Sequence, residues 1–196
     1  MVVNLAPGIV LHPYGSVPPA VEPGGLVLAQ FPRPAAFGDG THPTTRLCAG
    51  ALDLLCRQRQ PGAVLDVGTG TGVLARIARA RGAAFVAGTD IDPEALACAR
   101  DHAQLDSAAV PIHFGQEAPD HWGARFGLVV ANILEDPLRD LAAALSRALA
   151  PKGVLLISGF TRPQAPSLRV LCQKAGVTVV SESHLEDWAL LRLEPL

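Results

Sequence analysis

Short apolar runs alternate with segments of helical periodicity along most of the chain. The apolar runs lie at 63–67, 85–89, 110–114, 128–131 and 154–158, and leucine and alanine recur at helical spacing between them. Buried parallel strands are apolar along their whole length, because helices cover both faces of the sheet. The pattern therefore predicts an α/β domain with a doubly wound, mostly parallel sheet.

Proline, glycine and capping residues mark where the expected helices begin and end. The first helix is expected to have Thr44 or Thr45 as its N-cap and to end at Pro61-Gly62, and Asp92 is expected to cap the helix that follows it. The other expected helices are 72–81, 93–105, 137–150 and 167–175, and the last two expected strands are 177–181 and 188–193.

Residues 1–36 form a different kind of segment. They contain seven of the 17 prolines and the pair Gly24-Gly25. Because proline fixes φ and lacks a backbone donor, this segment is not expected to hold a central strand or a long helix. We expect extended segments and turns packed on the rest of the protein, with a short strand at 26–29. The expected division is a proline-rich extension, 1–36, and one domain, 37–196.

The composition narrows the class of protein. A chain of 196 residues with 49% hydrophobic residues is long enough to bury a core and too apolar for intrinsic disorder. Its 16 basic and 18 acidic residues give a net charge of −2, which argues against a basic nucleic-acid surface. No apolar run has the length of a membrane span, no signal-peptide pattern is present, and the four cysteines lack metal-ligand spacing. We expect a cytoplasmic protein without a metal site, membrane contact or direct nucleic-acid binding.

A glycine-rich loop, Asp66-Val67-Gly68-Thr69-Gly70-Thr71-Gly72, joins a predicted strand to the next helix. Glycines at such a junction let a ligand approach the backbone and the free N–H groups of the helix. Dinucleotide-binding loops have the spacing G-x-G-x-x-G, whereas these glycines stand at alternate positions behind an acidic residue. The arrangement resembles the class I S-adenosylmethionine-dependent methyltransferases of Rossmann-like fold. The resemblance implies S-adenosyl-L-methionine as cofactor, contacts from Asp66, Gly68 and Gly70, and an antiparallel C-terminal strand.

Polar residues stand at the carboxyl ends of three further predicted strands. Asp90 follows the second, where a carboxylate accepts the ribose hydroxyls of an adenosyl group. Gln116, or a backbone amide beside it, follows the third and is placed to hydrogen-bond the adenine. Asn132 ends the fourth, beside the topological switch point where open α/β sheets bind ligands. The alternative is that Asn132 caps the next helix.

The segment Phe37-Gly38-Asp39-Gly40-Thr41-His42-Pro43-Thr44-Thr45 precedes the first regular helix. Together with Thr89-Asp90-Ile91-Asp92-Pro93 and Ala131-Asn132-Ile133-Leu134, it is similar to the PrmA family, the ribosomal protein L11 lysine methyltransferases. The family pattern in this loop is F-G-T-G-x-H-x-T-T, and the resemblance runs from about Phe37 to the C-terminus. It implies cofactor contacts from Thr45, Gly68, Asp90 and Asn132, and a loop from Phe37 and Gly38 to His42 that closes over the methionine part.

The resemblance also implies a function and a partner. The expected function is methylation of lysine amines on a basic protein, with a large-subunit ribosomal protein as the expected partner. The chain departs from the family pattern in two respects. Family members usually carry a separate N-terminal domain that grips the ribosomal substrate, and about 36 residues before the loop are too few for it. Asp39 replaces the usual threonine and puts a carboxylate in the loop nearest the expected methyl group.

Methyl transfer to an amine requires a positioned and deprotonated nucleophile. A lysine ammonium with a pKa near 10.4 costs about 4–5 kcal/mol to deprotonate at pH 7, and a positive neighbour and dry surroundings reduce that cost. We expect Asn132 to orient the amine, and His42 or Asp39 to accept its proton, although a loop histidine also serves packing. Glu135 and Asp136 either attract a cationic protein or complement the N-terminus of the following helix.

Three functions remain open from the sequence. The first is a protein lysine N-methyltransferase. The second is a methyltransferase for small molecules or nucleic acids, which is disfavoured by the acidic charge and by Ile133-Leu134 where base methyltransferases have a stacking aromatic residue. The third is a non-catalytic paralogue that binds S-adenosylmethionine, and tight cofactor binding without turnover would favour it.

Overall fold

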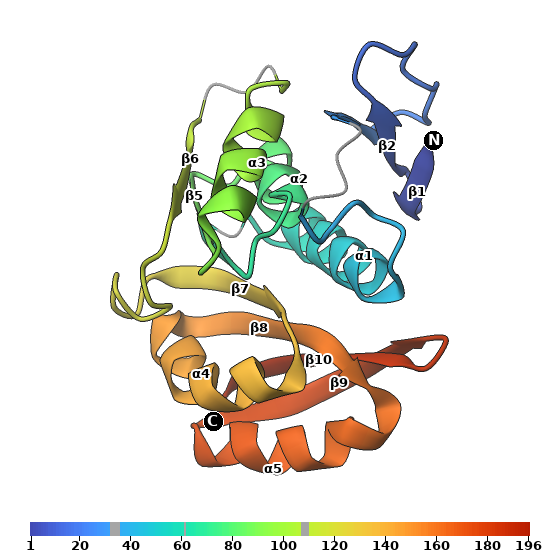
Figure 1. Cartoon of the computed structure of the whole chain (residues 1–196). Coiled ribbons are helices and arrows are strands. Elements are labelled where there is room, and N and C mark those ends of the chain that lie inside the picture. The colour runs from blue at the N-terminus through green and yellow to red at the C-terminus, as the bar shows by residue number, and fades with distance from the viewer. Residues whose placement is uncertain (32–35, 61, 107–109) are drawn as a thin grey trace.

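The computed structural model describes residues 1–31, 36–60, 62–106 and 110–196. Its main body is a seven-stranded sheet with the strand order β6-β5-β4-β7-β8-β10-β9 (Figure 1). Neighbouring strands from β6 to β8 are parallel, and β10 is antiparallel to both β8 and β9. The prediction of a doubly wound, mostly parallel sheet with an antiparallel C-terminal strand is confirmed.

The elements follow the predicted order along the chain. The strands of the main sheet are β4 (Ala63–Val67), β5 (Phe85–Thr89), β6 (Ile112–Gly115), β7 (Phe126–Asn132), β8 (Leu149–Thr161), β9 (Val177–Leu185) and β10 (Trp188–Pro195). The helices are α1 (Pro43–Gln58), α2 (Val73–Ala80), α3 (Pro93–Ala103), α4 (Glu135–Ala148), the short 3₁₀ helix η1 (Arg162–Gln164) and α5 (Ala165–Lys174).

Several element boundaries differ from the predicted ones by a few residues; α4 and α5, for example, each begin two residues earlier than expected. The differences at α1 and β8 have identifiable local causes. The N-cap of α1 is His42, whose side chain accepts the N–H of Thr44, so the expected cap at Thr44 or Thr45 was wrong. Pro61, which was expected to stop this helix, lies outside the described residues. β8 begins directly after α4 and includes 151–153, where a turn was expected. Lys152 has a φ of 64° there, and the pairing of β8 with β7 is irregular near this point.

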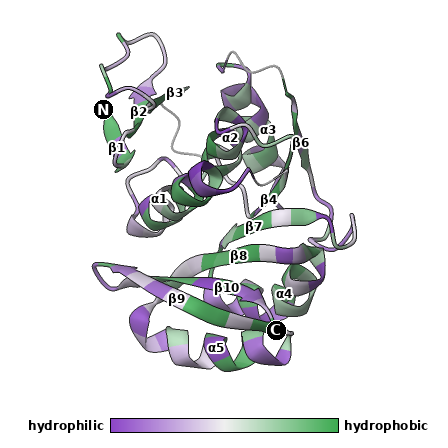
Figure 2. Ribbon diagram, turned by 180° about the vertical axis from the view of Figure 1, so that it is seen from behind, coloured by the Kyte–Doolittle hydropathy of each residue, from purple (hydrophilic) through white to green (hydrophobic). Residues whose placement is uncertain are grey.

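Helices cover both faces of the sheet, α1, α2 and α3 on one side and α4 and α5 on the other (Figure 1). Two hydrophobic clusters fill the layers between sheet and helices. The first contains Leu52 of α1 and Ile77 of α2, and the second contains Leu138 of α4 and Leu168 of α5. β7 and β8 are hydrophobic along most of their length (Figure 2), as expected for strands that are buried on both faces. Among the helices of the described residues, none is long and apolar enough to cross a membrane.

The N-terminal segment forms a small three-stranded sheet of its own. It consists of β1 (Val3–Ala6), β2 (Ile9–Pro13) and β3 (Leu26–Gln30), with β1 antiparallel and β3 parallel to β2. The expected strand at 26–29 is present, whereas β1 and β2 were not predicted. Prolines in this region stand between or at the ends of these strands and do not interrupt them. Leu5 and Leu11 share one hydrophobic cluster with α1 and α2, so this sheet packs on the main body.

The order in which strands are added to the sheet reverses at β4, so that β5 and β7 lie on opposite sides of it. From β4 it continues to β5 and β6 on one side, then returns to place β7 on the other side of β4. The loop after β4 and the end of β7 therefore meet at the carboxyl edge of the sheet, where ligands bind in folds of this kind.

Candidate active site

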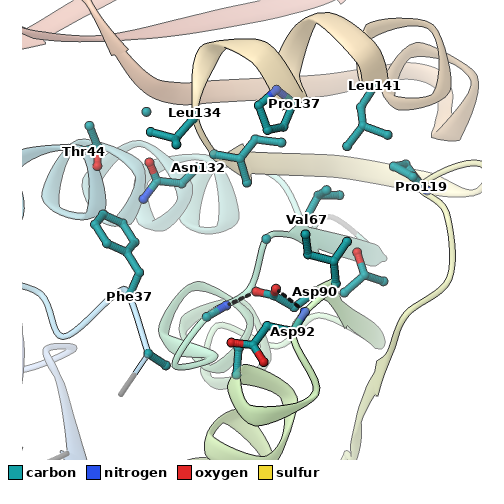
Figure 3. Close-up of a pocket in the computed structure, with 18 of the residues that line it drawn as sticks. Phe37, Thr44, Val67, Asp90, Asp92, Pro119, Asn132, Leu134, Pro137 and Leu141 are labelled. Atoms are coloured by element: carbon teal, nitrogen blue, oxygen red, sulfur yellow. Dashed lines mark hydrogen bonds between the residues drawn. The ribbon is translucent and has the colours of Figure 1, made fainter. Parts of the chain in front are cut away.

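A pocket of about 570 Å³ opens at this carboxyl edge (Figure 3). Phe37, Thr44 and Asn132 lie together at one side of it, and Pro119 and Leu141 lie at the other. Pockets of several hundred Å³ with a mostly apolar lining and a few polar groups are typical of small-molecule sites. The lining residues used below are Phe37, His42, Gly68, Gly70, Asp90, Asp92, Gln116, Glu117, Asn132, Ile133, Leu134, Pro137, Leu141 and Trp188.

The glycine-rich loop forms the floor of the pocket through Gly68 and Gly70. Both residues have positive φ, 70° and 53°, which side chains rarely adopt. A Cβ at Gly70 would collide with the carbonyl oxygen of Phe37, and a Cβ at Gly68 would collide with the Ile133 side chain. The glycines thus leave room for close approach of the two neighbouring segments. Both line the pocket, and their cofactor contacts stay a prediction.

Asp90 is fixed at the end of β5 by two backbone amides. The N–H of Gly70 donates to its Oδ2 at 3.0 Å and the N–H of Asp92 donates to its Oδ1 at 3.1 Å (Figure 3). Each carboxylate oxygen accepts more than one hydrogen bond, so acceptor capacity remains toward the pocket. Asp92 accepts the N–H of Glu94 and is the N-cap of α3, as predicted.

Asp66 does not line the pocket, contrary to its expected cofactor contact. It is fully buried in β4, and its Oδ2 accepts both the Thr69 hydroxyl at 2.6 Å and the Ala75 N–H at 3.1 Å. Burial raises the pKa of this carboxyl from 3.8 to about 6. Asp66 therefore shapes the glycine-rich loop from behind.

The end of β6 presents a carboxylate that the sequence analysis missed. The amide of Gln116, expected to contact the adenine, donates to the carbonyl of Ile91 at 2.8 Å. The neighbouring Glu117 also lines the pocket, and its Oε2 is buried without a hydrogen-bond partner among the described residues. Its Oε1 lies 2.9 Å from Nε2 of His113, and its own backbone N–H, followed by His113, holds the pKa of this carboxyl below its usual value. An unpaired buried acceptor in a pocket is a ready partner for an amino group.

Asn132 presents its carbonyl oxygen without a partner. Its Nδ2 faces the hydroxyl of Thr45 at 3.5 Å, while Oδ1 is buried and has no partner within the described part of the chain. Asn132 does not cap α4, because Leu134 occupies that position. Thr45 is 1% exposed and lies behind Asn132 instead of lining the pocket, so its expected direct cofactor contact is not seen.

Three aromatic rings stand beside Asn132. The ring of His42 lies 5.2 Å from that of Phe37 and 4.6 Å from that of Trp188, which it meets edge-on. Trp188 begins β10, far from the predicted motifs in sequence, and no sequence signal pointed to it. Phe37 is 54% exposed at the pocket mouth. Together with the aliphatic side chains of Ile133 and Leu134, the rings give this end an apolar lining.

The two candidate proton acceptors in the loop are both engaged elsewhere. Nδ1 of His42 accepts the Thr44 N–H at 3.3 Å, which places the proton of the neutral ring on Nε2 and makes that atom a donor. Asp39 is exposed and outside the pocket. Its Oδ1 accepts the backbone N–H and the hydroxyl of Thr41 at 3.0 and 2.7 Å, because an aspartate closes a turn with the residue two positions on.

Gly38 and Glu135 both lie outside the pocket lining. Gly38 is buried outside the lining, where its carbonyl accepts the Thr71 hydroxyl at 2.7 Å. Glu135 is held in a network with Arg139, Gln164 and Ser167, which favours its structural role at the start of α4 over contact with a cationic protein. In the described residues, no group of three or more His, Cys, Asp and Glu side chains is placed to hold a metal ion.

Comparison with known proteins matches this chain to one family. The family model described as ribosomal protein L11 methyltransferase (PrmA) matches residues 26–194. The chain belongs to the PrmA family.

The curated PrmA relatives are longer than this chain. The ribosomal protein L11 methyltransferase of Rhodopseudomonas palustris is 38% identical over 186 residues, which cover 92% of this chain and 63% of that protein. The one from Geobacter metallireducens is 41% identical over 170 residues, covering 87% of this chain and 55% of that protein. The chain thus spans about half to three-fifths of the length of these relatives.

Solved structures agree with the family assignment. The crystal structure of a ribosomal protein L11 methylase from Lactobacillus delbrueckii superposes with a TM-score of 0.84 at 28% identity, covering 99% of this chain and 98% of that one. The N-methyltransferase NodS from Bradyrhizobium japonicum, at 15% identity and a TM-score of 0.61, shares the fold alone. The fold is that of the class I methyltransferases, for which S-adenosylmethionine is the methyl donor.

Proposed function

We propose that this chain transfers methyl groups from S-adenosylmethionine to lysine amines of a ribosomal protein, and that its substrate is ribosomal protein L11 in the cytoplasm. The observation that carries the proposal is one pocket with two chemically different ends. Asp90 and Glu117 present carboxylates at one end, and Asn132 presents an unpaired amide oxygen among apolar side chains at the other. Family membership and the names of the relatives support the same activity.

The residues present fit an S-adenosyl group. Asp90 would hold the ribose hydroxyls and Glu117 the amino group of the adenine. Gly68 and Gly70 let the Ile133 side chain and the Phe37 carbonyl approach the loop that lines the pocket. When bound, this cofactor supplies an electrophilic methyl group on a positively charged sulfur. The positive charge on the sulfur would lower the pKa of an amine next to it, so the chain needs no cationic side chain beside the amine for this purpose.

The acceptor end would bind and orient the amine. The apolar walls and the aromatic rings of Phe37 and Trp188 would exclude water and hold the lysine stem, and aromatic faces also attract an ammonium group. A dry pocket lowers the pKa of the entering amine and so reduces the cost of deprotonation. Oδ1 of Asn132 would accept a remaining N–H and direct the lone pair. His42, as an Nε2 donor, would orient Asn132 or the substrate and would not act as the base.

We also propose that residues 37–196 form the catalytic domain and that 1–36 are an extension of it. Leu5 and Leu11 pack in the cluster that supports α1 and α2, so the extension stabilises the helices behind the glycine-rich loop.

Transfer of labelled methyl groups to ribosomal proteins tests the proposal. The chain is incubated with labelled S-adenosylmethionine and ribosomal proteins from cells that lack L11 methylation. We expect label on lysine residues of L11. Label on a different basic protein would contradict the proposed substrate. Binding of S-adenosylhomocysteine with no label on any protein would contradict the proposed activity and favour a non-catalytic cofactor-binding role.

A further inference from the structure

Thr71, near the end of the glycine-rich loop, holds the segment that closes one end of the pocket. Its N–H donates to the carbonyl of Phe37 at 3.0 Å, and its hydroxyl donates to the carbonyl of Gly38 at 2.7 Å. Thr71 is 2% exposed and does not line the pocket. The backbone carbonyl of Thr71 can therefore accept a hydrogen bond from a side chain that lies outside the pocket.

His102 of α3 holds that carbonyl. Nδ1 of His102 lies 3.1 Å from the Thr71 carbonyl oxygen, and Nε2 accepts the N–H of Phe31 at 3.1 Å. A carbonyl only accepts and an N–H only donates, so one neutral form of the ring, with its proton on Nδ1, satisfies both contacts. The Phe31 ring also stacks on the imidazole, with 5.8 Å between centroids and 20° between planes. A single buried side chain thus joins the glycine-rich loop to the residue after β3.

A second contact joins β3 to α2, which lies on the same face of the main sheet as α3 (Figure 1). Arg76 of α2 is 1% exposed; it donates to the carbonyl of Ala29 at 2.7 Å and pairs with Asp106 at 2.6 Å. At the end of β3, the Gln30 side-chain amide donates to the backbone carbonyl of Asp39 at 3.2 Å. Thr71 and β3 therefore hold the segment 37–39 from two sides. His102 contacts Thr71 on one side and, on the other, Phe31, the residue that follows β3.

We propose that His102 is a positioning residue for the site: by holding the Thr71 carbonyl and the Phe31 N–H together, it sets where Phe37 and Gly38 lie over the pocket. The inference rests on the proposed function, because the pocket end it shapes is the one proposed to bind the amine, under the loop that the family resemblance places over the methionine part of the cofactor. His102 is 1% exposed and touches no pocket-lining atom in the contacts above, so it acts only through Thr71 and β3.

The surroundings of His102 keep it in the required neutral form. Burial is the largest effect and lowers the pKa of the imidazole below its ordinary value, and the charge of Arg76 acts in the same direction, whereas the contact with the Thr71 carbonyl and the charge of Asp101 act in the opposite one. Cys98, one turn earlier on α3, lies 3.7 Å from Nδ1. Protonation would put a second N–H on Nε2, facing the N–H of Phe31, and would remove the contact that joins β3 to α3.

Two variants separate the ring from its hydrogen bonds. His102→Phe keeps a ring that stacks on Phe31 and loses both bonds, whereas His102→Gln keeps one donor and one acceptor on a flexible stem. Amide hydrogen exchange is measured at Thr71 and at 36–42 in the protein without ligand, together with the affinity for S-adenosylhomocysteine. For His102→Phe we expect faster exchange at these amides and an affinity weakened by about two- to tenfold, the size of one or two lost hydrogen bonds. His102→Gln should restore part of both.

Leu168→Ala is the matched control for general destabilisation. Leu168 is fully buried in the other hydrophobic cluster, on the opposite face of the sheet, so its variant should lower the melting temperature without changing either local measurement. Unchanged exchange at Thr71 and at 36–42 in His102→Phe, or the same change in Leu168→Ala, would overturn the inference. Amide hydrogen exchange is measured in the ligand-free protein, so its outcome does not depend on the proposed function. The proposed function would fail through a different result, namely a wild-type chain that binds S-adenosylhomocysteine and methylates nothing.

Discussion

The two ends of the pocket differ in how the chain assembles them. Gly68, Gly70 and Asp90 at the cofactor end come from two consecutive strand–loop–helix units, and the Gly70 N–H bonds directly to Asp90. At the acceptor end, Phe37, Asn132 and Trp188 come from three distant segments that meet only in the folded protein. The cofactor end is thus a local property of the fold, whereas the acceptor end depends on how separate segments pack.

The two ends also differ in electrostatic character. The cofactor end presents carboxylates that are already fixed by backbone amides or by a neighbouring histidine. The acceptor end holds one amide oxygen among aliphatic and aromatic side chains, with no charged group among the described lining residues nearest to it. Changes at the two ends should therefore separate cofactor binding from methyl transfer, and the following variants test that separation.

The largest effect is expected at Asn132. Asn132→Ala removes the acceptor that orients the amine, and we expect methyl transfer to fall by about 10²–10³-fold, the usual loss for a fixed polar group that acts on the reacting centre. The affinity for S-adenosylhomocysteine should change by less than about threefold, because Asp90 and Glu117 remain. Asn4→Ala, at an exposed position of β1, is the control. A variant that loses both properties together would show that Asn132 belongs to the cofactor end.

At the cofactor end, Gly70→Ala should have the next largest effect. The added Cβ collides with the Phe37 carbonyl at a residue with φ of 53°, so we expect binding of S-adenosylhomocysteine to weaken by about 10- to 100-fold. Calorimetric titration measures this loss. Gly82→Ala is the matched control, since Gly82 also has positive φ but nothing lies within 4 Å of its Cβ position. Gly82→Ala should lower stability by about 1 kcal/mol and leave the affinity unchanged.

Glu117 gives a test of chemical selectivity at the same end. If Oε2 accepts the adenine amino group, the wild-type chain should bind S-adenosylhomocysteine at least about tenfold more tightly than the inosine analogue, which has an oxygen in place of that amine. Glu117→Gln should reduce this preference, and Glu94→Gln, outside the pocket, should not. Equal binding of both ligands by the wild-type chain would remove Glu117 from the cofactor end.

The smallest effect is expected from Asp66, which supports the loop without lining the pocket. Burial raises its pKa from 3.8 to about 6, so the folded state binds this proton more tightly than the unfolded state. The resulting stabilisation is fully present below pH 3.8 and is lost as pH rises through about 6. Asp66→Asn keeps an oxygen for Thr69 and Ala75, and denaturant unfolding should show a difference from wild type that changes between these pH values, by about 2–3 kcal/mol at most.

Asp66→Asn also separates the effect of Asp66 on stability from the binding of the cofactor by the loop residues that line the pocket. We expect the difference in unfolding free energy to level off above pH 7, with the affinity for S-adenosylhomocysteine little changed at neutral pH. A difference that stays constant from pH 4 to pH 8 would show that Asp66 has the same charge in both states.

The sequence predicted the main sheet and the cofactor end more completely than the acceptor end. The apolar runs at 63–67 and 85–89 coincide with β4 and β5, because a strand that is buried on both faces leaves a continuous apolar signal. Gly68, Gly70 and Asp90 followed from their places directly after those strands. Asp66 was assigned to the pocket because it precedes the glycines, although alternate residues of a strand point to opposite faces.

The remaining features depend on contacts that sequence patterns do not encode. Trp188 reaches the site because β10 pairs with β8. Gln116 and Glu117 both line the pocket, and only the folded structure shows that the Gln116 amide group donates to the carbonyl of Ile91 while Oε2 of Glu117 has no partner among the described residues. Asp39 was placed near the methyl group by its position in the loop, yet its side chain closes a turn with Thr41. Local hydrogen bonds of this kind compete with any distant partner, and only the folded structure shows which one forms.

A crystal structure with bound S-adenosylhomocysteine tests the central claim, the division of the pocket into two ends, most directly. We expect the ribose hydroxyls on Asp90, the adenine amino group on Glu117, and the sulfur directed toward Asn132, with the space beside Trp188 left for the amine. An adenine found against Trp188, or a ligand that fills the space around Asn132, would contradict the assignment of the two ends.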